Sequence, residues 1–166
     1  MDTAIGVRDF ARRHLASIAS SSGRILYSAF QTLRPGSIYL LGLNPGGDPS
    51  THEDTVGTCL ATWEKRTDNA YLDESWTGRP LGRAPLQRRV QWLLSQLGFS
   101  VRDVCASNLI FTRSIDASGS GYPEIAHLCW PVHEQILRIV KPRLIIAFGN
   151  SDPSPFTYLH DKHRPG

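Results

Sequence analysis

Three short apolar runs are the clearest feature of the hydrophobic pattern along this chain. They occupy residues 38–43, 104–111 and 143–148, and a glycine or a polar residue follows each of them. Runs of this length with few polar positions are typical of strands that are buried on both faces, as in a parallel sheet covered by helices. The pattern therefore predicts three central strands.

Apolar residues at helical spacing fill the intervals before and between these strands. They predict amphipathic helices near residues 6–20, 85–97 and 125–140, and Pro85 suits the first turn of the second helix. Pro131 lies within the third helix, where it either kinks the helix or starts a second segment. Strands that alternate with helices imply an α/β fold, here a three-layer α/β/α arrangement with a central parallel sheet and right-handed crossovers.

Residues 48–83 interrupt this order. They show poor periodicity, and aromatic residues are interleaved with charged and small ones, so we expect a long irregular excursion from the sheet. Loops of such length are usually functional or mobile. The rings of Trp63, Tyr71 and Trp76 either stack on the bases of a nucleic acid or pack the excursion onto the domain.

Composition indicates an ordinary globular protein. The length of 166 residues favours a single domain over residues 1–166, and hydrophobic residues make up 40% of the chain. No apolar run approaches the length of a membrane-spanning helix, and charged residues interrupt the N-terminal segment, so we expect neither a membrane partner nor a signal peptide. The expected location is cytoplasmic, and the expected state is a monomer. The net charge of +3 is compatible with a polyanionic partner without demonstrating one.

The sequence offers little support for a metal or a cofactor. Three widely separated cysteines lack a paired spacing, and the histidines at positions 127, 133, 160 and 163 lack an evident third ligand. Neither the phosphate-binding pattern GxxxxGK[ST] nor the dinucleotide pattern GxGxxG occurs. We therefore expect buried thiols, no metal site and no cofactor.

Two asparagines stand out because each lies at the carboxyl end of a predicted strand, where ligands of open α/β sheets bind. Asn44 follows the first strand in a loop rich in glycine and proline, where it either faces a ligand or only bonds local backbone. Asn108 lies in the second apolar run, and a buried amide without partners costs about 1–3 kcal/mol. It either bonds backbone at the strand end or reads a ligand.

These segments resemble the uracil-DNA glycosylase superfamily, particularly its mismatch-specific and single-strand-selective branches. The sequence GLNPG at residues 42–46 matches the first motif of that family, GxNPG. The sequences SNLIFT at residues 107–112 and IVKPRLIIAFGN at residues 139–150 are similar to its second and third units. The resemblance covers residues 38–150 in the family's order.

The resemblance implies a DNA glycosylase that flips a uracil or a modified or mismatched pyrimidine out of DNA and hydrolyses its N-glycosidic bond. Asn44 would position the attacking water as the catalytic residue, and Asn108 would read the base in the pocket. DNA is the implied partner. The remaining implied substrate-binding residues are Gly42, Leu43, Pro45, Gly46, Gly47, Asp48, Tyr71 and Trp76.

The chain departs from the family after its third strand. The family continues to a fourth strand and a phosphate-gripping loop, whereas this sequence ends at Gly166. Its sequence DPSPF at residues 152–156 is similar to that loop, but it has aspartate in the leading position. We therefore expect that the last strand is missing, by truncation or by loss of the second motif. The alternative function is a nucleic-acid-binding or nucleobase-binding protein without catalysis.

Overall fold

A parallel three-stranded sheet organises the computed structural model, which describes residues 3–149 and 152–163. Its strands are β1 (Ile38–Gly42), β2 (Cys105–Asn108) and β3 (Leu144–Ala147), and β1 lies in the centre in the order β2-β1-β3. All three expected strands are therefore confirmed, and the fold is α/β. In the register of β1 against β2, Gly42 pairs with Asn108.

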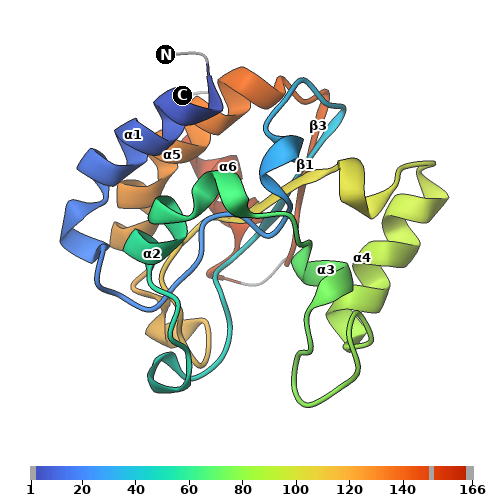
Figure 1. Cartoon of the computed structure of the whole chain (residues 1–166), viewed down its shortest axis with the longest axis horizontal. Coiled ribbons are helices and arrows are strands. Elements are labelled where there is room, and N and C mark those ends of the chain that lie inside the picture. The colour runs from blue at the N-terminus through green and yellow to red at the C-terminus, as the bar shows by residue number, and fades with distance from the viewer. Residues whose placement is uncertain (1–2, 150–151, 164–166) are drawn as a thin grey trace.

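Six α-helices within the described residues flank this sheet, in two groups (Figure 1). Alternate residues of a strand point to opposite faces, so each face builds its own hydrophobic cluster. Tyr39 and Leu41 belong to the larger cluster, whereas Ile38 and Leu40 belong to the smaller one. The helices are α1 (Ala4–His14), α2 (Val56–Ala61), α3 (Ala70–Asp73), α4 (Pro85–Gln96), α5 (Glu124–Val140) and α6 (Pro155–Lys162).

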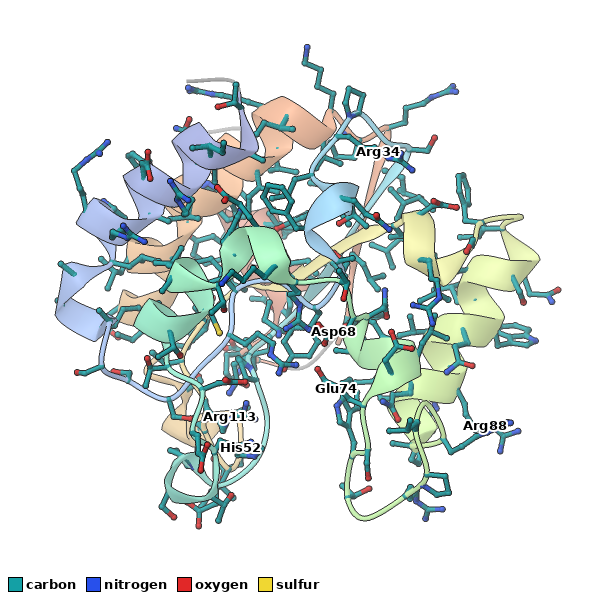
Figure 2. The ribbon with its side chains drawn as sticks, viewed as in Figure 1. Arg34, His52, Asp68, Glu74, Arg88 and Arg113 are labelled. Atoms are coloured by element: carbon teal, nitrogen blue, oxygen red, sulfur yellow. The ribbon has the colours of Figure 1, made fainter. Side chains whose placement is uncertain are left out.

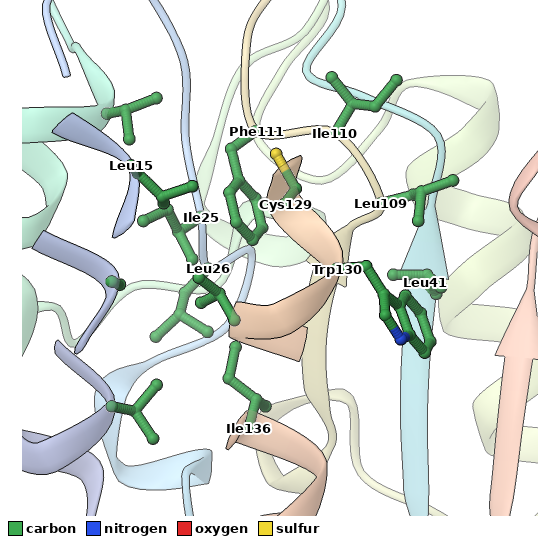
Figure 3. Packing of buried hydrophobic residues seen from close by; sticks show 14 of the residues in the cluster. Leu15, Ile25, Leu26, Leu41, Leu109, Ile110, Phe111, Cys129, Trp130 and Ile136 are labelled. Carbon is green, nitrogen blue, oxygen red and sulfur yellow. The ribbon is translucent and has the colours of Figure 1, made fainter. Parts of the chain in front are cut away.

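The larger cluster packs side chains of α1, α2, α5 and α6 against the sheet and the segments around it. Figure 3 shows Leu15, Phe111 and Ile136 among the buried side chains of this cluster. The smaller cluster joins α3 and α4 to the other face of the sheet. Burial of apolar surface on both faces explains why β1 has no polar position.

The helices begin and end where the local sequence satisfies their terminal backbone groups. Thr3 caps α1 by accepting a hydrogen bond from the backbone N–H of Gly6 at 3.1 Å. At the start of α4, the side chain of Gln87 accepts a hydrogen bond from the backbone N–H of Ala84 at 2.9 Å. Helix α5 continues through Pro131, so the interpretation that a second segment starts there is wrong.

Residues 48–83 are more ordered than the sequence suggests. They contain α2, α3 and two short 3₁₀ turns, and they bury the side chains of Trp63 and Tyr71. The segment lies outside the sheet, as expected, but it is less irregular than the hydrophobic pattern predicts. Helices of four to six residues are too short to show a helical repeat in that pattern, which explains the difference.

The edge strand β3 differs from the prediction of a fully buried strand. Leu144 is 50% exposed, and the other residues of β3 are only partly buried. Because β3 pairs only with β1 among the described residues, its second edge and part of its faces lie uncovered. Asn150, the last residue of the third resemblance segment, lies outside the described residues.

The described part of the chain contains no helix that combines the length and the apolar character needed to cross a membrane.

His133 is a buried, hydrogen-bonded residue of α5. Its Nε2 lies 3.1 Å from the carbonyl oxygen of Leu109, which only accepts, so Nε2 carries the proton. Its Nδ1 then accepts a hydrogen bond from the hydroxyl of Tyr39 at 2.8 Å. Burial lowers the pKa of His133 to about 4, so the neutral ring is part of the folded structure.

We expect the free energy of unfolding to fall as the pH decreases from about 6.5 to about 4, because the unfolded chain then binds a proton that the buried ring does not. The neutral ring contributes its full stability above the pKa of histidine in the unfolded chain, about 6.5. This contribution is lost as the pH falls to the pKa of His133 in the folded protein, about 4. The loss is on the order of 3 kcal/mol. Urea unfolding at several pH values measures it. A His133→Gln variant should lose much of this dependence, and an unchanged dependence would contradict the assignment.

Candidate ligand-binding site

A cavity of about 710 Å³ opens at the carboxyl ends of β1 and β2. The loops that follow the strands and the segment around α3 supply its walls, as expected for a parallel sheet. Most of the residues expected from the sequence line it, but Pro45 and Asp48 do not. The expected residues that do line it are Gly42, Leu43, Asn44, Gly46, Gly47, Tyr71, Trp76 and Asn108.

Asn108 lines the cavity and is buried, with only 4% of the residue exposed. Its Oδ1 lies against the Cα atom of Gly42, where a Cβ atom would collide with it. Its Nδ2 has no hydrogen-bond partner within the part of the chain that the structure describes. A buried amide donor without a partner is costly. The side chain lies near the hydroxyl of Tyr27, but its amide nitrogen forms no hydrogen bond of ordinary geometry with that group, so the donor is open to a ligand.

Asn44 also lines the cavity, but its amide nitrogen is engaged within the protein. Its Nδ2 donates to the hydroxyl of Ser114 at 2.7 Å and to the carbonyl oxygen of Pro45 at 3.0 Å. The backbone N–H of Ser114 donates to the same carbonyl oxygen at 3.1 Å. These bonds tie the loop after β1 to the loop after β2. The amide nitrogen of Asn44 therefore behaves as expected for a residue that forms hydrogen bonds within the protein.

Aromatic rings form one wall of the cavity. The ring of Tyr71 lies 5.6 Å from that of Trp76, 5.9 Å from that of Tyr27 and 6.5 Å from that of Phe148, measured between centroids. Tyr71 is buried in the smaller cluster while it lines the cavity, and burial raises the pKa of its hydroxyl. Tyr71 and Trp76 therefore both pack the segment onto the domain and line the cavity, whereas stacking on the bases of a nucleic acid stays a prediction.

A charged network lies beside this wall, and sequence reasoning missed it. Glu74 contacts the guanidinium of Arg24, pairs with Arg66 at 3.4 Å and accepts a hydrogen bond from Nε1 of Trp76 at 3.0 Å. Burial opposes the ionisation of Glu74, but Arg24 and Trp76 outweigh it and hold the pKa of the carboxyl below its ordinary value. Arg24 also lies over the ring of Tyr27, at 5.6 Å from the centroid.

His52 and Arg113 form the rim across the cavity from Glu74 (Figure 2). Arg113 donates through Nη1 to the carbonyl oxygen of Gly46, and its buried Nε has no partner among the described residues. Burial and the positive charges of Arg113 and Arg24 lower the pKa of His52, which is therefore neutral at pH 7. The rim carries positive charge from Arg113. No pattern in the sequence joined these residues.

Among the described residues, no group of three or more His, Cys, Asp or Glu side chains could hold a metal ion. The residues that line the cavity supply hydrogen-bonding groups, aromatic surfaces and charged side chains.

Comparisons with known proteins give partial similarities. No family model matches the chain, and no solved structure matches it. Two proteins named aldo-keto reductase, from Mycobacterium sp. strain KMS and strain JLS, are each 31% identical over 91 residues. The match covers 54% of this chain and 33% of each relative. The chain thus aligns with only about a third of the length of these curated relatives.

These comparisons correct the function expected from the sequence. The relatives are named as reductases, and nothing in the comparisons points to the uracil-DNA glycosylase superfamily. The predicted membership, the DNA glycosylase activity and the associated role in DNA repair are therefore wrong. The non-catalytic nucleobase-binding alternative gains no support either. The motif GLNPG is short, and loops with this composition arise wherever a buried strand ends in a tight turn. DNA as a partner stays a prediction.

Proposed function

We propose that this protein binds a small planar ligand through a carbonyl group in the cavity at the end of the sheet. The observation that carries the proposal is the unpaired Nδ2 of Asn108, which is buried where the cavity meets the strands. Most buried polar groups have partners, and an orphan donor in a cavity is readily satisfied by an oxygen atom of a ligand. A carbonyl oxygen only accepts, so it suits this amide nitrogen.

The walls supply the remaining features of the ligand. Tyr71, Trp76 and Phe148 offer aromatic surfaces to a flat ring. Arg113 on the opposite rim would attract a negatively charged substituent. Asn44 serves as a positioning residue, because its bond to Ser114 fixes the loop that forms the floor of the cavity. The expected ligand is an aromatic carbonyl compound that carries an anionic group.

A second candidate function is reduction of the bound carbonyl group, which the name of the two relatives favours. In such a reaction a hydride adds to the carbonyl carbon and a proton adds to its oxygen. Burial raises the pKa of Tyr27, against the opposing effect of Arg24, so its hydroxyl stays protonated beside Asn108. A bound hydride donor, such as a reduced nicotinamide or a reduced flavin, would be required. Formation of alcohol from an aromatic aldehyde with either donor tests this function.

We also propose a three-layer architecture, a single monomeric domain and a cytoplasmic location. A three-layer α/β/α arrangement is supported by the two hydrophobic clusters on opposite faces of the sheet. A single domain is supported by the chain length, and a monomer is proposed with it. A cytoplasmic location is supported by three free cysteines, two of which are buried.

An Asn108→Leu variant tests the binding proposal. We expect calorimetric titration with 4-formylbenzoate to show an affinity about three- to tenfold lower than that of the unmodified protein, because one neutral hydrogen bond is lost. The matched ligand 4-methylbenzoate has nearly the same shape without the carbonyl oxygen, and its affinity should not fall. The variant should fold, since it removes an unsatisfied buried amide. Equal affinity of the two ligands for the unmodified protein would contradict the proposal.

A further inference from the structure

A second and smaller cavity, of about 230 Å³, lies between α2, the 3₁₀ turn Trp63–Lys65 and the segment that contains Arg24. Arg24 lines both cavities, and the other residues of the smaller cavity do not line the larger one. The functions proposed for the larger cavity do not involve the smaller one. It is therefore a separate candidate for ligand binding.

Two buried hydrogen-bond donors at this cavity have no partner within the described ranges. They are Nε1 of Trp63 and Nε of Arg24. The side chain of Trp63 is only 3% exposed, so bulk water does not solvate its indole nitrogen. Indole and guanidinium nitrogens donate hydrogen bonds and cannot accept them. Two residues that line one cavity thus carry unsatisfied donors, which an acceptor bound there would satisfy.

The two unpaired donors favour an acceptor over a cationic ligand, and Lys65, which forms no ion pair among the described residues, favours an acceptor that is anionic. Three cationic and two acidic side chains line the space. The acidic ones are Asp54, which pairs with Arg24 at 3.3 Å, and Asp68, which pairs with Arg66 at 3.0 Å. Lys65 adds a further positive charge at the opening. Because the terminal nitrogens of Arg24 hold Glu74 and Asp54, its Nε remains available without breaking either pair.

We propose that this cavity binds a small carboxylate. One carboxylate oxygen accepts from Nε1 of Trp63 and the other accepts from Nε of Arg24, with Lys65 at the opening. A water molecule occupies about 30 Å³ in the liquid, so a cavity of about 230 Å³ has room for a small ligand of about seven heavy atoms. The proposal is independent of the function proposed for the larger cavity.

The indole resonances of the unmodified protein give the direct test. Acetate should shift the Nε1–H signal of Trp63 in a saturable manner, whereas acetamide at the same concentration and sodium chloride at the same ionic strength should not. Acetamide has the same number of heavy atoms as acetate but no charge. Trp63→Phe identifies the signal, and Trp92→Phe on the exposed face of α4 is the matched control. An unresponsive Trp63 signal, or an equal response to acetamide, would overturn the proposal.

Alkylation of Cys59 gives an independent readout, because this partly buried thiol lines the same cavity while Cys105 and Cys129 are buried elsewhere. Acetate should slow the modification of Cys59. Trp63→Phe should raise the acetate concentration needed by about tenfold or more, the range expected for a hydrogen bond to a charged group. Lys65→Met changes an exposed side chain and should weaken protection while it preserves the fold. Full protection in both variants would exclude this site.

Discussion

Replacing Gly42 with alanine should destabilise the protein and disrupt the larger cavity at once. The new Cβ atom would collide with Oδ1 of Asn108, which pairs with Gly42 in the central register of the sheet. Phe148 lies 3.7 Å from the same position, so the methyl group has little room to shift. Overpacking of this kind typically costs about 1–3 kcal/mol. Chemical denaturation should show a loss of stability in that range, and 4-formylbenzoate should bind poorly because Asn108 must move.

The double variant Gly42→Ala/Asn108→Ala separates the two effects. It removes the atom with which the new methyl group collides, so stability should recover relative to Gly42→Ala alone. Ligand affinity should not recover, because the amide donor is gone. Coupling between the two sites is expected for residues in direct contact. Unchanged ligand affinity in the single Gly42→Ala variant would contradict the placement of the ligand against Asn108.

Replacing Glu74 with glutamine should cause a comparably large loss of stability. Glutamine keeps the size of the side chain and an acceptor for Trp76, but it removes the charge that compensates Arg24 and Arg66. Loss of one partner of a buried ion pair costs about 3–5 kcal/mol. The side chain of Glu74 is 23% exposed, so solvent screening reduces the expected loss to about 2–3 kcal/mol. Urea unfolding at pH 7 measures this loss.

Glu64→Gln is the matched control for this change. Glu64 is 44% exposed and pairs with Arg8 at 2.7 Å on the surface, so the same chemical change should cost at most about 1 kcal/mol. The pKa of Glu74 is lowered by its partners, so its stabilising effect is present above the ordinary value of 4.5 and is lost as the pH falls below it. The difference between the unmodified protein and Glu74→Gln should therefore shrink in acid. A constant difference would contradict the role of the charge.

The sequence was a good guide to the strands and to the place of the cavity. Continuous apolar runs arise from burial on both faces, which is a local requirement of each central strand, so the pattern located β1 and β2. Asn44 was recognisable because it follows the first apolar run, and Asn108 because it is a polar amide within the second run. The glycine at position 42 was recognisable as a loop and strand-end residue. Its contact with Asn108 depends on strand register, which the sequence does not specify.

The charged part of the site could not be predicted in the same way. Arg24 and Glu74 lie 50 residues apart in the chain, and Arg113 reaches Gly46 across 67 residues. Pairs at such separations leave no periodic signal in a single sequence. The short helices in residues 48–83 hid the segment that brings Glu74, Tyr71 and Trp76 to the cavity. A short motif was also insufficient for function, because the comparisons do not support the family that GLNPG suggested.

The sequence by itself determined the α/β class, the three strands and the edge of the sheet where polar residues gather. These features follow from the hydrophobic effect acting on local patterns of apolar residues. Only the tertiary structure decided which side chains surround the cavity, which donors remain unpaired and how the buried charges compensate one another. Those properties arise from contacts between distant segments. The amide of Asn108, the indole of Trp63 and the carboxylate of Glu74 acquire their chemistry from that packing.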